Sequence, residues 1–206
     1  TDDVRLGLEK YADLVAEYND IKLLPQLDGY CTWYSRPHGG AGDEKSIIEL
    51  SEFAMKELKP YGFDFVQIDD KWQEGKRRNG PAKVFDRVSP VGPYKGGMKP
   101  VARKIVNMGL VAGIWWMPFA GDHEDPFFAN KLDWFTKKAD GTPYHTPWGG
   151  TALDMTNPKA LKYVGFLANR MANQWGYKYF KMDGMWMGTS SRQIYVNNGY
   201  KGEDDL

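Results

Sequence analysis

Two charged side chains interrupt an apolar run near residue 180, in the segment KYFKMDGMW (178–186). Side chains alternate between the faces of a strand, so Lys181 and Asp183 point in the same direction if this segment is extended. A buried carboxylate is costly unless it is paired or hydrogen-bonded, and the lysine is expected to keep Asp183 charged. An anionic carboxylate of this kind suits a nucleophile better than a general acid. A purely structural ion pair is the alternative.

Two adjacent aspartates, Asp69 and Asp70, end a second apolar run, FDFVQIDD (63–70). Neighbouring residues face opposite sides of a strand, so both enter one cavity only if the chain turns here. Paired carboxylates can accept hydrogen bonds from vicinal hydroxyls, or one can act as an acid and the other as a base. The alternatives are a cap for the next turn and a metal site shared with Asp183. Lys181 beside Asp183 disfavours the metal site, and we expect no metal and no cofactor.

Tryptophan is unusually frequent, with 8 in 206 residues. Its ring offers a large flat apolar face and a single donor, on which a sugar ring can stack, although a large aromatic core explains the count as well. Five tryptophans at or just beyond predicted strand ends are expected to line a sugar pocket, allowing for one or two in the core: Trp33, Trp72, Trp115, Trp116 and Trp186. The other three are assigned to structure, with Trp148 left open because it lies in a loop: Trp134, Trp148 and Trp175.

Four predicted strands alternate with helices, which predicts a parallel sheet with helices outside. The strands are expected at 28–35, 63–70, 110–118 and in 178–186, and the helices at 1–18, 42–62, 98–109 and from an N-cap at Thr156 or Asn157. Polar residues collect at the carboxyl ends of these strands, as in a (β/α)8 TIM barrel. The competing fold, an open doubly wound sheet, lacks its GxGxxG loop in SRPHGGAGDE (35–44).

A barrel of this type takes about 250 residues, and four β/α units make half of one. We therefore expect 1–206 to be a single domain, the N-terminal portion of a catalytic barrel, preceded by a leading helix (1–20). The segments from 71 to 97 and from 119 to 152 are expected to be long loops. In the first loop, Arg36 and His38 are expected in solvent, with contact to a ligand as the alternative.

Composition argues against several classes of protein. The 27 basic and 27 acidic residues cancel, so nucleic-acid binding is not expected. No apolar run approaches the roughly 20 residues of a membrane span. Cys31 is the only cysteine, and the three histidines make no zinc signature. The charged N-terminus has no signal-peptide core, which fits either a cytosolic protein or one whose leader was removed. Oligomeric state is not predicted.

Together these motifs form a series that resembles the melibiase-type α-galactosidases, glycoside hydrolase families 27 and 36. The series covers about residues 28 to 187 and runs in order through YCTWYS, FVQIDDKWQ, GGMKPVARKIVNMGLVAGIWWMPF, LDWFTKKADGTPY, LDMTNP and KYFKMDGMW. The resemblance implies a retaining glycosidase on a (β/α)8 barrel, acting on α-galactoside oligo- or polysaccharides by double displacement. The resemblance depends on the whole series of motifs occurring in the family's order, since each motif alone is weak evidence.

Residue roles follow from the same resemblance. Asp183 maps onto the nucleophile and Lys181 onto the lysine that contacts nearby sugar hydroxyls. Asp69 and Asp70 map onto the pair that distinguishes galactose from glucose. Three tryptophans map onto pocket walls: Trp115, Trp33 and Trp72. The family's acid/base follows the sixth strand, which we expect beyond this chain, so the chain alone is expected to turn over little or no substrate.

Other activities remain open under this resemblance. They are an α-galactosyltransferase of the raffinose-synthase type, a related glycosidase acting on α-N-acetylgalactosamine, α-glucose or β-arabinopyranose, and a non-catalytic sugar-binding barrel. Two features depart from the family pattern. The residues after Asp183 are Gly184, Met185 and Trp186, and the basic segment EGKRRNGPAKVFDRVSP (74–90) has no assigned role.

Overall fold

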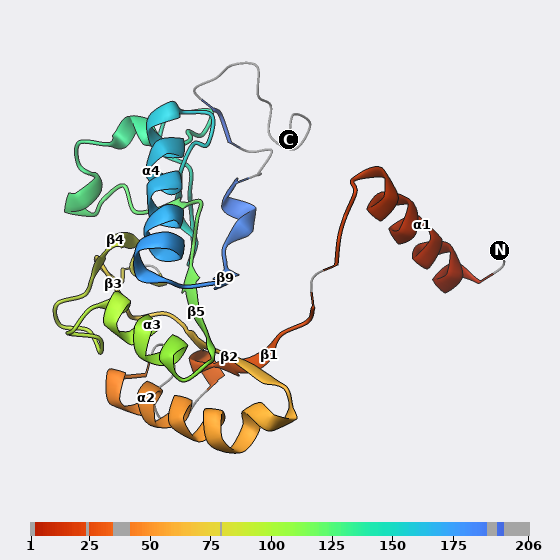
Figure 1. Ribbon diagram of the computed structural model, residues 1–206. Helices are drawn as coiled ribbons and strands as arrows, with labels where there is room; N and C mark the ends of the chain where they lie inside the picture. Colours follow the sequence, from red (N-terminus) through yellow and green to blue (C-terminus); the bar gives the residue numbers. More distant parts are fainter. Residues whose placement is uncertain (1–2, 24, 35–41, 79, 189–192, 196–206) are drawn as a thin grey trace.

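The four long predicted strands form one parallel sheet. In a computed structural model, which describes residues 3–23, 25–34, 42–78, 80–188 and 193–195, the strands are β1 (Asp28–Cys31), β2 (Phe63–Ile68), β5 (Val111–Trp116) and β9 (Tyr179–Met182). They pair in the order β1-β2-β5-β9, which is also their order along the chain, and every pairing is parallel (Figure 1). Successive parallel neighbours joined through helices are the repeating unit of a barrel. The chain therefore forms part of a (β/α) barrel, as predicted.

Three helices connect the strands, and their ends follow local sequence signals. Helix α2 (Glu44–Phe53) begins at Asp43, whose carboxylate accepts from the Ser46 amide, and further helical turns continue to Tyr61. Helix α3 (Met98–Asn107) precedes β5. Helix α4 (Pro158–Asn169) begins at Asn157, whose side chain accepts from the Lys159 amide, and helical turns continue to Trp175. These turns end at Gly62 and Gly176, where glycine adopts positive φ easily.

The main core lies between the sheet and these helices. Val66, Ile68 and Ala112 are fully buried from the sheet, and they share one apolar cluster with Val101 and Ile105 of α3. Such alternation buries one face of each strand beneath the helices and leaves the other face to the barrel interior. The polar residues that follow each strand are thereby collected at one edge of the sheet.

Both predicted long loops contain short strands. The segment after β2 folds as a hairpin of β3 (Gln73–Glu74) and β4 (Val84–Val88). The segment after β5 holds a small antiparallel sheet, ordered β6 (Ala120–Gly121), β8 (Gly150–Ala152) and β7 (His145–Thr146). The prediction of plain loops was wrong here, because strands of two or three residues are too short to leave a periodic pattern.

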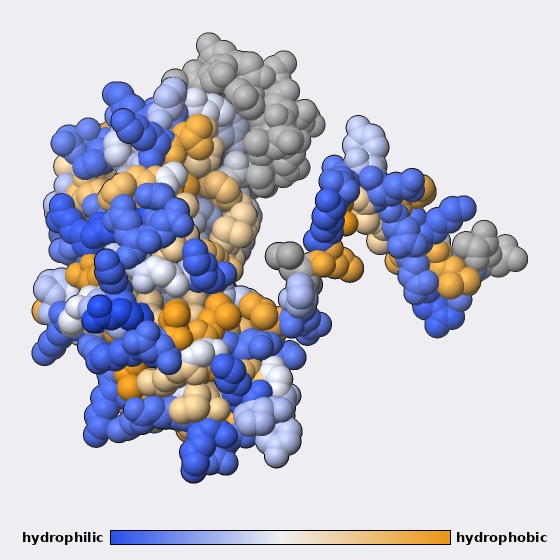
Figure 2. Space-filling view, in the orientation of Figure 1, coloured by the Kyte–Doolittle hydropathy of each residue, from blue (hydrophilic) through white to orange (hydrophobic). Residues whose placement is uncertain are grey.

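The leading helix, α1 (Val4–Tyr18), forms as predicted but buries none of its residues. Figure 1 shows it apart from the sheet and its helices, and its apolar side chains are exposed in the space-filling view (Figure 2). Within the described part of the chain, no helix is both long and apolar enough to cross a membrane.

Candidate active site

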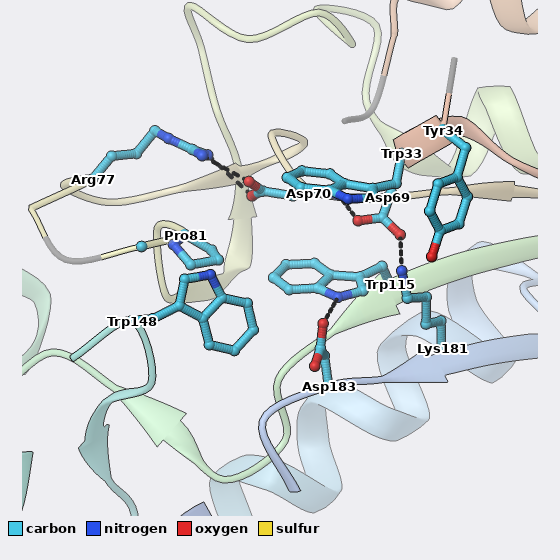
Figure 3. A pocket seen from close by; sticks show the side chains of 11 residues that line it. Trp33, Tyr34, Asp69, Asp70, Arg77, Pro81, Trp115, Trp148, Lys181 and Asp183 are labelled. Atoms are coloured by element: carbon cyan, nitrogen blue, oxygen red, sulfur yellow. Dashed lines mark hydrogen bonds and ion pairs between the residues drawn. The ribbon is translucent and has the colours of Figure 1, made fainter. Parts of the chain in front are cut away.

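A pocket of about 380 Å³ opens at the carboxyl ends of the barrel strands (Figure 3). Its size is in the range of small-molecule sites. The lining combines carboxylates, cations and aromatic rings: Trp33, Tyr34, Asp69, Asp70, Arg77, Gly80, Pro81, Trp115, Trp148, Lys181 and Asp183. Six of the seven site residues predicted from the sequence are among them. Arg36 and His38 lie outside the described residues.

Strand register brings Lys181 and Asp183 into this pocket. Lys181 of β9 is the register partner of Trp115 on β5, and the amide of Asp183 extends the same ladder by donating to the Trp116 carbonyl at 3.0 Å. Asp69 follows β2, and its amide donates to the Thr32 hydroxyl at 2.9 Å. Because neighbouring parallel strands end at one edge, residues more than a hundred positions apart share one cavity.

The cation of Lys181 pairs with Asp69 rather than with Asp183. Its Nζ donates to Asp69 Oδ2 at 2.8 Å, and Asp69 also accepts from Gln67 Nε2 at 3.0 Å. Burial opposes the charged form of Lys181, but the hydrogen bond and the charge of Asp69 outweigh it and raise the pKa of Lys181. The expected Lys181–Asp183 pair was therefore wrong: the long lysine side chain reaches across β5 to the buried carboxylate, which has the greater need of a counter-charge.

Asp183 is held by neutral donors instead. Its Oδ2 accepts from the indole Nε1 of Trp115 at 3.0 Å, and its Oδ1 accepts from the Gly184 amide at 2.8 Å. Both bonds fix the direction of the carboxylate without neutralising its charge. The arrangement presents an oriented anion to the cavity, which is what attack on an electrophilic carbon requires.

Asp70 is bound by an arginine that the sequence did not identify. Arg77, from the hairpin loop, donates Nη1 to Oδ1 at 3.0 Å and Nη2 to Oδ2 at 2.7 Å, a bidentate pair. Gln73 Nε2 and the Lys71 amide add bonds to Oδ1, both at 2.7 Å. The basic segment 74–90 thus has a structural partner. Only the hairpin fold, which returns this loop over the strand ends, could have revealed it.

Comparison with known proteins bears on the identity of this pocket. No family model matches the chain. An α-galactosidase of Lachancea cidri is 30% identical over 116 residues, which cover 56% of this chain and 23% of that protein. A Flavonifractor plautii protein described as an A type blood α-D-galactosamine galactosaminidase is 28% identical over 153 residues, covering 68% and 13%. An α-galactosidase from Thermus thermophilus, solved with p-nitrophenyl α-D-galactopyranoside, gives a TM-score of 0.66 at 25% identity, over 89% of this chain and 34% of that one.

In sequence and in fold, this chain is similar to α-galactosidases. A family 36 α-galactosidase from Geobacillus stearothermophilus, at 15% identity and a TM-score of 0.63 over 82% of this chain and 22% of that one, supports the barrel fold alone. The chain spans less than a quarter of the curated relatives' length and about a third of the Thermus chain.

The tryptophans of this chain divide between pocket and core. Trp33 and Trp115 line the pocket, as expected, with Trp33 at its exposed rim. Trp72 does not: its ring is 0% exposed, packs at right angles on Trp175 and donates Nε1 to the Trp115 carbonyl at 2.9 Å. Its assignment as a pocket wall was wrong, because the turn after Asp70 directs its side chain beneath the strand ends. Trp116 is also buried in the core, since it alternates with Trp115.

Two aromatic residues in the lining were missed or left open. Tyr34 borders the pocket beside Lys181, whose Nζ lies 5.8 Å from its ring centre. Trp148, which a loop position left undecided, also lines it. Among the described residues, no group of three or more histidine, cysteine, aspartate or glutamate side chains could hold a metal ion.

Proposed function

We propose that the protein to which this chain belongs is a retaining glycosidase that releases terminal α-galactosyl residues, with Asp183 as the nucleophile. The observation that carries the proposal is the oriented carboxylate of Asp183 in one cavity with Asp69, Asp70 and Lys181. The relatives named above, α-galactosidases among them, support the same reaction. The chain would then be the first half of a single catalytic barrel domain.

The chemistry assigned to these residues is a double displacement. A carboxylate oxygen of Asp183 attacks the anomeric carbon, and the bond from that carbon to the leaving oxygen breaks through an oxocarbenium-like transition state. A second carboxyl group, about 5–5.5 Å away in retaining enzymes, gives its proton to the leaving oxygen. That group then takes a proton from water, which hydrolyses the glycosyl ester and releases Asp183.

Asp69 and Asp70 are poor choices for that second group. Each is ion-paired, Asp69 with Lys181 and Asp70 with Arg77, so each is placed to accept hydrogen bonds rather than to donate a proton. We assign them, with Lys181, to binding sugar hydroxyls. Trp115 and Trp33 would supply the apolar walls. The acid/base is assigned to the remainder of the barrel.

The test is an assay of the full-length protein on an aryl α-galactoside, with Asp183→Asn beside wild type. We expect activity to fall by several orders of magnitude with the thermal unfolding midpoint nearly unchanged. Asp13→Asn, on the exposed helix α1, is the matched control and should retain activity. Turnover close to wild type in Asp183→Asn would refute the proposal.

Release of α-galactosamine is a second candidate. It is favoured by the Flavonifractor galactosaminidase, which aligns over 153 residues, against 116 for the Lachancea α-galactosidase. The two sugars differ at the carbon next to the anomeric centre. Assay of aryl α-galactoside and aryl α-galactosaminide side by side separates them by their kcat/KM values, and a higher value for the amino sugar would replace the first candidate.

A further inference from the structure

Two stacked tryptophans have no role in the reaction described above. Trp148 lies in the loop before β8 and lines the pocket, whereas Trp186, three residues after the proposed nucleophile, lies outside the pocket lining and packs against Trp148. Their rings stack, with centroids 5.7 Å apart and planes inclined by 30°. We propose that this pair binds the second sugar ring of an oligosaccharide, the one attached to the galactose through the bond that is cleaved. The proposal rests on the glycosidase function proposed above.

Trp148 is fixed in an unfavourable backbone conformation. Its φ is 62°, a value that bulky residues rarely adopt. Gly80 makes room for it, because a Cβ there would lie 2.6 Å from the Trp148 carbonyl oxygen and 2.9 Å from its Cδ1. The surroundings thus hold this ring in one place, as is common at ligand sites.

Trp186 is anchored through the short helix Met185–Gly188. Met187, three residues beyond Gly184, is fully buried, and its amide donates to the Gly184 carbonyl at 3.0 Å. Gln193 Nε2 donates to the Met187 carbonyl at 2.9 Å. The ring of Trp186 itself remains 53% exposed. An exposed aromatic ring on an anchored turn presents a rigid apolar surface at low entropic cost.

The position of the pair follows from the orientation of the bound sugar. Asp69 and Asp70 are buried at the inner end of the pocket and would bind the hydroxyls remote from the bond that is cleaved. Asp183 must face the anomeric carbon. Trp148 and Asp183 line the same pocket, and Figure 3 shows them on one side of it, away from Tyr34. The leaving sugar therefore emerges over Trp148 and Trp186.

A pyranose ring suits such a surface. One face of the ring carries mainly C–H groups, and a flat indole covers it while the hydroxyls stay in water. Trp33, on the opposite rim, would contact the galactose instead. Substitutions at the two rims should therefore have different effects on substrates with and without a second ring.

The experiment compares two substrates in the full-length protein: the trisaccharide raffinose and α-galactosyl fluoride, whose leaving group has no ring. We measure the ratio of their kcat/KM values, raffinose over fluoride. In Trp186→Ala this ratio should fall about tenfold, about 1.4 kcal/mol, and Trp186→Phe should restore most of it. Trp33→Ala should lower both values together and leave the ratio near wild type.

An unchanged ratio in Trp186→Ala would overturn the inference. A ratio that falls only in Trp33→Ala would also overturn it, because the leaving sugar would then contact the rim formed by Trp33. Asp183→Asn separates this failure from failure of the proposed function. If Asp183→Asn is inactive while the ratios contradict the inference, the glycosidase stands without this subsite. If Asp183→Asn retains activity, or wild type hydrolyses neither substrate, both proposals fall.

Discussion

The ion pair between Lys181 and Asp69 gives a quantitative prediction for Lys181→Met. The carboxylate side chain of Asp69 is 3% exposed, whereas the lysine side chain is 32% exposed. Removing one partner of a buried pair costs about 3–5 kcal/mol, because the other charge is left uncompensated. Here the partial exposure of Lys181 reduces that figure, and Gln67 still donates to Asp69. We expect the free energy of unfolding to fall by about 2–3 kcal/mol.

The double variant separates the pair from the lysine itself. In Asp69→Asn with Lys181→Met neither charge of this pair remains, so the loss should shrink to about 1 kcal/mol, which makes the two substitutions strongly non-additive. Chemical unfolding of the full-length protein, followed by tryptophan fluorescence, measures both values. Lys178→Met, an exposed lysine on the same segment, is the control and should stay within about 0.5 kcal/mol of wild type.

The sign of the pH dependence follows from the raised pKa of Lys181. A cation with a higher pKa in the folded state contributes stability below its unfolded pKa and loses it as pH rises through the folded value. The effect of Lys181→Met should therefore be the same from pH 6 to pH 8. An effect below about 0.5 kcal/mol, or additivity in the double variant, would refute the reasoning.

Three further predictions concern the same region. Trp72→Ala should lower the free energy of unfolding by about 3–5 kcal/mol, as for other buried tryptophans, whereas Trp33→Ala should weaken sugar binding with little change in the unfolding midpoint. Gly184→Ala should reduce both stability and turnover, because the φ of Gly184 is 64° and the new Cβ would lie 2.6 Å from a methionine methyl. Gly141→Ala is the control: its φ is 81° and its new Cβ would have nothing within 4 Å, so it should show only the smaller backbone cost and full activity. Burial lowers the pKa of Lys83 to about 8, so between pH 8 and pH 10 the folded state binds fewer protons than the unfolded state. Over this range wild type should gain thermal stability relative to Lys83→Met, by at most about 3 kcal/mol. Equal differences in unfolding midpoint between the two proteins at pH 8 and at pH 10 would contradict this.

Local patterns in the sequence predicted the parallel sheet and the ends of its strands at which the pocket forms. Hydrophobic periodicity and capping residues act over a few positions, so β2, β5 and α4 could be placed from their own residues. The presence of Asp69 and Asp183 at one end of the sheet followed in the same way. Strands of two or three residues, such as β3 and β6, were beyond this approach.

Only the tertiary structure decided which of these side chains meet. Lys181 pairs with Asp69, 112 positions away, and not with Asp183, two positions away, because the buried Asp69 carboxylate is stabilised by a counter-charge. Arg77 reached Asp70 because the hairpin turned back over the strand ends. The packing of distant elements also places Trp72 in the core and Trp148 in the pocket lining. Contacts between distant residues depend on how whole elements pack, and no local pattern encodes that packing.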